Sequence, residues 1–187
     1  MSTERFLSVY TPTHKRPMLL RLCRASVESQ TLPCEHVVIP DEVGIGIAGV
    51  YAALPEHAPK ASGAYVMVLS DDNILVDETF AAELRREAER ADWPDAIVFK
   101  GQIADSVQPL SWGGEPQIEK IDLSCFAVRR RVWLAHAADW GHRYEGDFDF
   151  IHAVWACGHR LHWWDRLAFR ALQIGRGAPE PAEMVTA

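Results

Sequence analysis

The sequence predicts an α/β protein whose central sheet is mainly parallel and is covered by helices on both faces. Short apolar runs typical of buried strands alternate with amphipathic runs typical of helices, and the chain of 187 residues is 48% hydrophobic and 24% charged. That length and composition suit one domain with a sizeable core. We therefore expect a single domain over residues 1–175. The Gly-, Pro- and Ala-rich end of the chain should leave residues 176–187 as a flexible tail.

Four buried strands are expected in the first hundred residues. Each is a short run rich in β-branched or aromatic residues and is bounded by proline or polar side chains. Strands that alternate with helices pair mainly in parallel. The expected strands are residues 6–11, 36–40, 64–69 and 95–100.

Three helices should connect these strands. The first begins at Pro17, whose fixed φ suits a first helical turn, and its apolar residues recur at helical spacing up to Val27. The second is short and ends before Pro55. The third has Asp77 as its expected N-cap and runs through Ala91.

The second half of the chain is less regular. Residues 102–120 include glycines and prolines in close succession, which predicts a loop. Strand and helix patterns then resume. We expect a strand over residues 122–128, helices over residues 129–138 and 146–156, and a last strand over residues 160–164.

Polar side chains follow three of the expected parallel strands. They are Thr11-Pro12-Thr13 after the first strand, Asp41-Glu42 after the second, and Ser70-Asp71-Asp72-Asn73 after the third. In open α/β sheets the ligand crevice lies beyond the carboxyl ends of the strands. The sequence therefore predicts a binding site at this edge of the sheet.

The charge of the chain restricts its partners. The formal net charge is −7 and the pI is about 5.6, which disfavours nucleic-acid binding because that binding depends on Lys and Arg at phosphates. A phosphate-rich ligand would need a cation to offset the repulsion, and a divalent metal ion is the natural candidate. Asp71 and Asp72 supply the oxygen ligands that Mg²⁺ prefers, although an Asp-rich turn before a helix cap is an equally good explanation of the two residues.

We expect a cytoplasmic protein. The chain has four cysteines without a Cys-x-x-Cys pair, which suits reduced thiols. No apolar run approaches the ~20 residues that cross a bilayer, and the start of the chain lacks the pattern of a signal peptide.

Several segments resemble the GT-A-fold glycosyltransferases, specifically the large inverting family two. Residues 63–73 (GAYVMVLSDDN) are similar to the family's apolar strand and the Asp-x-Asp motif that follows it. Residues 9–17 (VYTPTHKRP) look like its first strand and Pro-Thr-x-x-Arg-Pro loop, and residues 146–150 (GDFDF) look like its Glu-Asp-x-Asp segment. Weaker matches cover residues 26–31, 37–41 and 124–133.

The resemblance implies a metal-dependent enzyme that takes a sugar from a nucleotide-diphosphate donor, with a UDP-sugar favoured. Residues 1–100 would bind the donor, with Pro12 and Thr13 beside the nucleoside and Asp41 hydrogen-bonded to the base. Asp72 would bind Mn²⁺ or Mg²⁺ with help from Asp71.

Further roles concern the cation and the phosphates. A late histidine often joins the metal site of such enzymes, and His162 is the candidate here. Arg16 belongs to a basic patch with its two preceding residues, which could steer phosphate or pair with acids.

Residues 101–175 would bind the acceptor and carry out catalysis. The resemblance implies that Asp147 takes the proton from the acceptor hydroxyl as this oxygen attacks the anomeric carbon, with inversion. An acidic residue in a first helical turn is otherwise a favourable partner of the helix dipole. Asp149 and Glu145 are alternative bases. Trp112, in a glycine-flanked loop, could pack against an acceptor sugar.

The sequence departs from the family pattern at several places. Ser70 replaces the first Asp of Asp-x-Asp, and Gly146 replaces the Glu before the base. Two other functions therefore stay open. One is a nucleotidyltransferase, although the glycine-rich stretch over residues 44–49 carries no Lys or Arg. The other is a non-catalytic module that binds nucleotide sugars.

Overall fold

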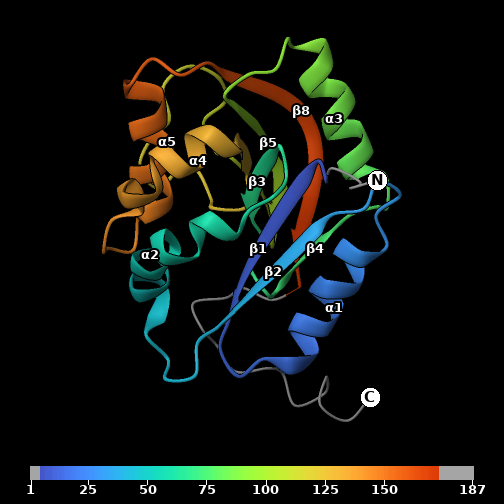
Figure 1. Cartoon of the computed structure of the whole chain (residues 1–187), viewed down its shortest axis with the longest axis vertical. Coiled ribbons are helices and arrows are strands. Elements are labelled where there is room, and N and C mark those ends of the chain that lie inside the picture. The colour runs from blue at the N-terminus through green and yellow to red at the C-terminus, as the bar shows by residue number, and fades with distance from the viewer. Residues whose placement is uncertain (1–4, 173–187) are drawn as a thin grey trace.

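An eight-stranded sheet forms the centre of the protein in a computed structural model that describes residues 5–172 (Figure 1). Seven strands run in the order β2-β1-β3-β7-β5-β8-β4, and β6 pairs with β5. The strands are β1 (Leu7–Thr13), β2 (Glu35–Pro40), β3 (Tyr65–Val68), β4 (Asn73–Leu75), β5 (Ala96–Ile103), β6 (Ser106–Gln108), β7 (Phe126–Arg129) and β8 (Leu161–Ala171).

The sheet is mostly parallel. β2, β1 and β3 pair in parallel, and β5 pairs in parallel with β8. β7 lies antiparallel between β3 and β5, so these two strands run in the same direction as each other. β4 and β6 are the remaining antiparallel strands. The predicted α/β class with a mainly parallel sheet is therefore confirmed.

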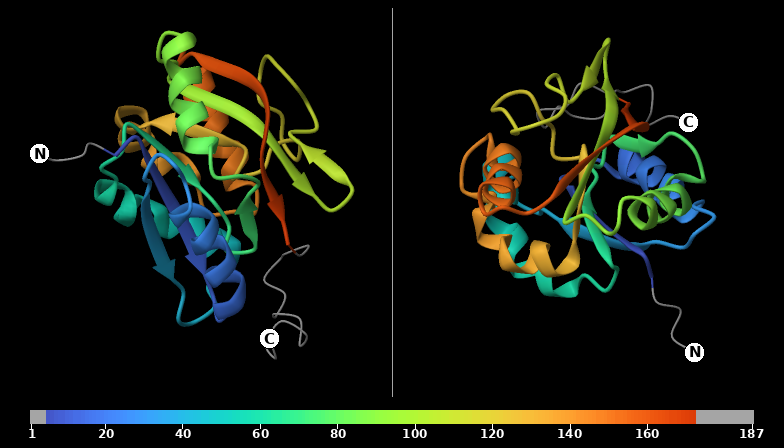
Figure 2. Two further views of the ribbon diagram at one scale, coloured as in Figure 1. Left: turned by 90° about the vertical axis from the view of Figure 1, so that its right-hand side faces the viewer. Right: turned by 90° about the horizontal axis from the view of Figure 1, so that it is seen from above.

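Helices cover both faces of the sheet, and the view from above separates the two groups (Figure 2, right). One face carries α1 and α3, and the other carries α2, α4 and α5. The helices are α1 (Pro17–Glu28), α2 (Gly46–His57), α3 (Phe80–Arg90), α4 (Arg130–Ala135) and α5 (Gly146–Ala156), with short 3-10 helices η1 (Ala58–Lys60) and η2 (Ala137–Trp140). Within residues 5–172, no helix is both long and apolar enough to cross a membrane.

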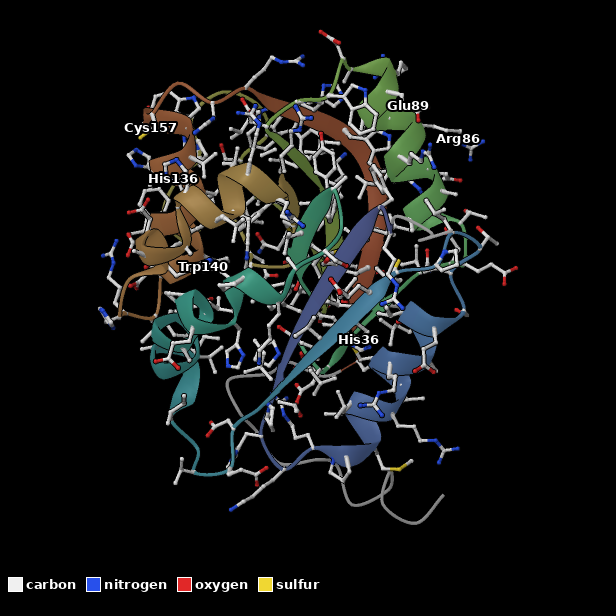
Figure 3. All side chains as sticks on the ribbon, viewed as in Figure 1. His36, Arg86, Glu89, His136, Trp140 and Cys157 are labelled. Atoms are coloured by element: carbon white, nitrogen blue, oxygen red, sulfur yellow. The ribbon has the colours of Figure 1, made fainter. Side chains whose placement is uncertain are left out.

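Aromatic side chains fill the core beneath α4 and α5. Trp140, labelled in Figure 3, stacks on Phe150 with ring centroids 4.4 Å apart and on Tyr51 at 5.4 Å. Trp133 meets Trp140 edge to face at 5.7 Å, and all four rings are buried. Aromatic pairs at such distances contribute beyond their buried area. This cluster joins α2, α4, η2 and α5, and thereby helps to position the first turn of α5.

Most predicted helices begin where expected, but three details differ. The second helix was expected to end before Pro55, whereas α2 runs through Pro55 to His57. Pro17 occupies the first turn of α1, as predicted. Asp77 is not the N-cap of α3, because Thr79 holds that position and the carboxylate of Asp77 accepts hydrogen bonds from Thr79 and Arg166. The expected helix over residues 129–138 is divided into α4 and η2.

The strands differ more from expectation. β1 continues through Pro12 to Thr13, because its pairing with β3 ends at Tyr10 and the missing N–H of Pro12 faces no strand on that side. β4 and β6 were not predicted. β8 extends seven residues beyond the expected end at position 164, and the expected strand over residues 122–128 begins only at Phe126. The expected tail over residues 176–187 lies outside the described residues.

Candidate active site

Asp71 and Asp72 lie in the turn between β3 and β4, at the carboxyl edge of the parallel strands. Ser124, just before β7, holds this turn. Its hydroxyl accepts hydrogen bonds from the Asn73 side chain (3.0 Å) and from the Ser70 backbone N–H (3.4 Å). Asp71, Asp72 and Asn73 are all buried. The polar strand end expected from the sequence is therefore a fixed part of the interior.

Arg16 pairs with both of these carboxylates. Its Nη2 lies 2.9 Å from Oδ1 of Asp71, and its Nη1 lies 3.3 Å from Oδ2 of Asp72. Thr13, at the end of β1, donates its hydroxyl to Oδ2 of Asp71 at 2.7 Å. Burial raises the pKa of Asp72, and the guanidinium of Arg16 opposes that rise. The expected donor-site residues Thr13, Arg16 and Asp71 thus form one bonded group with Asp72.

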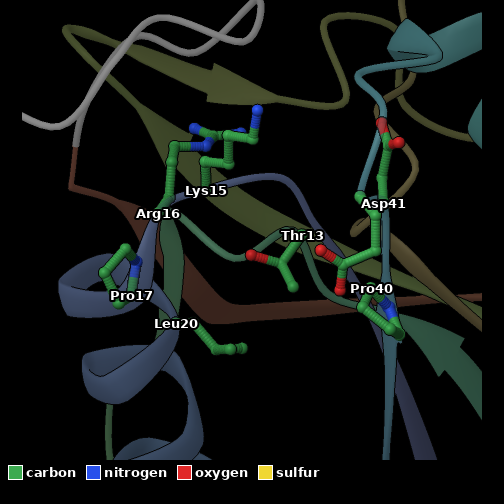
Figure 4. A pocket seen from close by; sticks show the side chains of 8 residues that line it. Thr13, Lys15, Arg16, Pro17, Leu20, Pro40 and Asp41 are labelled. Atoms are coloured by element: carbon green, nitrogen blue, oxygen red, sulfur yellow. The ribbon is translucent and has the colours of Figure 1, made fainter.

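A pocket of about 210 Å³ opens beside this group (Figure 4). Arg16, Pro17 and Leu20 line one side of it, and Pro40 and Asp41 line the other. Thr13, Lys15 and Glu42 complete the lining. The pocket therefore lies between the ends of β1 and β2 and the first turn of α1, where the sequence predicts a nucleoside site. Pro12 lies just before Thr13 in β1, and it pairs with Ile39 of β2.

Asp41 has a structural task at the edge of the pocket. Its carboxylate accepts the backbone N–H groups of Val43, Gly44 and Ile45 at 3.1, 2.7 and 2.7 Å. Burial alone would raise the pKa of Asp41, but these hydrogen bonds and nearby His14 hold it below its usual value. Asp41 therefore shapes the loop into α2. Its expected hydrogen bond to a nucleobase stays a prediction.

Asp72, Asp122 and Asp147 form a carboxylate series in which each charge acts on the next. Burial raises the pKa of Asp122 to about 6, and the Asp72 carboxylate adds to the rise. Burial likewise raises the pKa of Asp147 to about 7, and the Asp122 carboxylate adds to it. An acidic side chain in the first turn of a helix normally has a lowered pKa because the helix dipole favours the anion. At Asp147 burial and repulsion outweigh that effect.

The two alternative bases both lie near Arg143. Nε of Arg143 donates to Oδ2 of Asp149 at 2.7 Å, and Nη2 of Arg143 contacts the other oxygen. Glu145 lies 4.0 Å from the same guanidinium. Asp147 is the carboxylate of this segment whose pKa lies near neutrality.

His162 does not join Asp72. It lies near the start of β8, and its Nε2 is 2.6 Å from Oε1 of Glu87 on α3. Asp72 lies at the other end of that strand, because its carbonyl accepts the N–H of Leu172 at 2.7 Å. Ten residues of extended chain span about 30 Å. The expectation that His162 and Asp72 bind one metal ion is therefore wrong.

Trp112 packs over β5 and β8. It meets Trp163 edge to face at 5.2 Å, and Nζ of Lys100 lies 4.8 Å from the centre of its ring. The side chain is nevertheless 40% exposed. The loop that carries it is tied to α5 by Glu115, whose Oε1 lies 3.1 Å from Nε2 of His152. A role in acceptor binding stays a prediction.

Comparison with solved structures shows what this arrangement resembles. S. aureus TarS, in a fragment of residues 1–349, matches with a TM-score of 0.65 and 12% identity over 89% of this chain. The same fragment in complex with UDP-GlcNAc matches with a TM-score of 0.63 and 12% identity over 97% of the chain. The fold is glycosyltransferase-like. This chain spans only 60% of the length of the TarS fragment.

A second neighbour is similar in size to this protein. A197 from STIV matches with a TM-score of 0.52 and 13% identity, over 94% of this chain and 95% of A197. No family model matches the sequence, and no curated protein matches it by sequence. The similarity to these two neighbours is therefore a similarity of three-dimensional structure.

A divalent metal ion does not fit the residues as they are arranged. Within residues 5–172, no group of three or more His, Cys, Asp or Glu side chains is placed to hold a metal. The two carboxylates expected to take part are each paired with Arg16. Carboxylate oxygen is the right donor for Mg²⁺ or Mn²⁺, but here the guanidinium of Arg16 already pairs with one oxygen of each carboxylate.

Asp122 is the residue that the sequence did not indicate. It precedes β7, and the antiparallel direction of β7 brings the start of this strand to the edge where β3 ends. The available signal was a carboxylate, Asp122, just before the apolar run of β7. This signal indicates a site residue only when the direction of β7 is known, and the sequence pattern did not give that direction.

Proposed function

We propose that this protein is a glycosyltransferase that moves a sugar from a nucleoside-diphosphate sugar to an acceptor hydroxyl with inversion of configuration. The neighbour TarS, a glycosyltransferase, is solved with UDP and with UDP-GlcNAc. The pocket between β1, β2 and α1 supplies a place for the nucleotide, with Lys15 and Arg16 in its lining. The GT-A family two assignment rests on the sequence motifs described above.

The carboxyl of Asp147 is the observation that carries this proposal. A general base works best when its pKa lies near the working pH, and burial together with Asp122 raises the pKa of Asp147 to about 7. In the proposed reaction Asp147 accepts the acceptor's hydroxyl proton while that oxygen forms a bond to the anomeric carbon. The bond from this carbon to the diphosphate oxygen breaks, and the nucleoside diphosphate leaves with the electron pair.

Release of nucleoside diphosphate from a panel of nucleotide sugars, with and without candidate acceptors, tests the proposal. Asp147→Asn should lower the turnover by about 10²–10⁴-fold, the usual contribution of a general base. Asp105→Asn, in an exposed turn, is the matched control and should retain full activity. Full activity in Asp147→Asn would contradict the assignment, and donor binding without any turnover would favour a non-catalytic nucleotide-sugar-binding module.

A further inference from the structure

We propose that Arg16 takes the place of the divalent cation, so that the nucleoside diphosphate binds to a guanidinium held by Asp71 and Asp72 and needs no metal ion. This inference rests on the proposed function and specifies how the same site recognises its donor. The acidic chain needs a positive charge to hold a diphosphate, and the structure contains one at the expected place.

The geometry fixes Arg16 in one position. Two of its terminal nitrogens face two different carboxylates at 2.9 and 3.3 Å, and the Thr13 hydroxyl holds Asp71 from the other side at 2.7 Å. The side chains of Arg16, Asp71 and Asp72 are 14%, 1% and 9% exposed. A planar guanidinium held at two corners loses little further freedom when an anion binds to its remaining donors.

Arg16 still has donors to offer. A guanidinium carries five N–H groups in a fork, and the contacts to Asp71 and Asp72 use only part of them. Its Nε is buried and has no hydrogen-bond partner among the described residues. Because Arg16 also lines the pocket, a phosphate group there would meet a preoriented donor of the kind that binds phosphate with two parallel hydrogen bonds.

Lys15 adds a second cation beside Arg16. It lines the same pocket, and its backbone has a φ of 49°, in the left-handed region that residues other than glycine rarely adopt. Such a conformation persists where the surrounding structure enforces it, often at ligand sites. It places the ammonium group on the same side of the pocket as the guanidinium (Figure 4).

Metal entry would be opposed by the same arrangement. A divalent ion that bound Asp71 or Asp72 would have to displace Arg16 from its carboxylates. The displaced guanidinium stays positively charged at any physiological pH, so it would remain in the pocket as a like charge beside the metal ion. Arg16 and a divalent metal ion therefore cannot both bind Asp71 and Asp72.

Calorimetric titration of the wild-type protein with UDP, GDP and dTDP, in Mn²⁺ and separately in EDTA, tests the inference. The nucleotide that binds should do so with nearly equal affinity in both buffers. A fall of about tenfold or more in EDTA, which is a loss of one charge-assisted contact or more, would overturn the role of Arg16. Binding of none of the three in either buffer would instead count against the proposed function.

Variants of Arg16 make the test specific. Arg16→Ala should lose about tenfold or more of the affinity measured in EDTA, and Mn²⁺ should restore part of it because Asp71 and Asp72 are released to bind the metal. Arg16→Lys keeps the charge without the fork, should fold as the wild type does, and should fall between the two. Arg21→Ala, an exposed residue of α1, is the matched control and should bind as the wild type does.

Two results contradict the inference even if Arg16→Ala is poorly folded. One is wild-type binding that requires Mn²⁺, and the other is unchanged metal-free affinity in an Arg16→Lys protein whose fold is confirmed by circular dichroism.

Discussion

Gly146 lies directly against the ring of Tyr51. A Cβ added to Gly146 would be 2.4 Å from Cδ2 of Tyr51 and 2.2 Å from the carbonyl oxygen of Trp140. The first turn of α5 is therefore pressed onto α2 and η2, and Asp147 follows in the next position. This contact explains why Gly146 stands where the related motif has Glu: no side chain fits at this position.

Gly146→Ala should destabilise the protein by about 2–3 kcal/mol, because overpacking of a tight interior contact typically costs 1–3 kcal/mol. It should also reduce sugar transfer, since the first turn of α5 must shift and carries Asp147 with it. Urea unfolding and turnover measure the two effects. Gly114→Ala is the matched control: a Cβ there meets open space, and its φ of 71° leaves only backbone strain, about 1 kcal/mol. Equal losses in both variants would contradict the packing argument.

The pH dependence of transfer should follow the carboxyl of Asp147. Because its pKa is raised to about 7, the base is protonated in acid and ionised above neutrality. The value of kcat/KM should therefore rise with pH through a midpoint near 7. A flat profile between pH 5.5 and 8.5 would show that no group with this pKa acts in catalysis.

Asp122→Asn should move that profile. The Asp122 carboxylate is the largest contributor after burial to the raised pKa of Asp147, so its removal should shift the midpoint toward lower pH without abolishing turnover. Glu119→Gln, an exposed acidic change in the loop before Asp122, should leave the midpoint in place. The shift distinguishes an electrostatic role of Asp122 from a purely structural one, which would change the rate alone.

Asp147→Asn should stabilise the fold above neutral pH. A carboxyl whose pKa is higher in the folded state binds protons more tightly when folded, so its favourable contribution is fully present below pH 3.8 and is lost as the pH rises through about 7. The asparagine variant does not suffer this loss. We expect it to exceed the wild type by on the order of 1–2 kcal/mol at pH 8, after allowance for partial solvent exposure, and to match it near pH 4. Thermal unfolding across this range measures the difference.

The sequence predicted the parts of the site that depend on local pattern. The apolar run before Asp71 required a buried strand, and α5 spans the predicted residues 146–156. Pairings between distant residues were not accessible in the same way. The direction of β7 depends on contacts such as Tyr65 with Arg129, and the bonds of Arg16 to two carboxylates join positions more than fifty residues apart.

Charged side chains are also the reason that the second half of β8 was not predicted. β8 continues through Asp165 and Arg166, which were interpreted as the end of a strand. In the structure Asp165 pairs with Lys100 at 2.6 Å, and Arg166 pairs with Glu83 at 2.8 Å. These charges lie where the pairing of β8 with β5 is interrupted, between Trp163 and Leu167. Partners from distant segments make them compatible with a strand, and single-sequence patterns do not show those partners.

The hydroxyl of Ser124 should be needed to hold the turn that carries Asp71 and Asp72. It accepts hydrogen bonds from the buried side chain of Asn73 and from the N–H of Ser70. Ser124→Ala leaves the Asn73 amide without this acceptor, which should cost about 1–3 kcal/mol. Urea unfolding of Ser124→Ala, Asn73→Ala and the double variant gives the coupling energy between the two side chains.

Donor affinity should fall along with stability in Ser124→Ala, because the turn positions the carboxylates that hold Arg16. Ser106→Ala, an exposed serine of β6, is the control and should change neither quantity by more than about 0.5 kcal/mol. If Ser124→Ala and Asn73→Ala were additive in the double variant, the hydrogen bond between them would not be what fixes the turn. In that case other contacts, such as those of Arg16 and Thr13 with the carboxylates, would hold the turn.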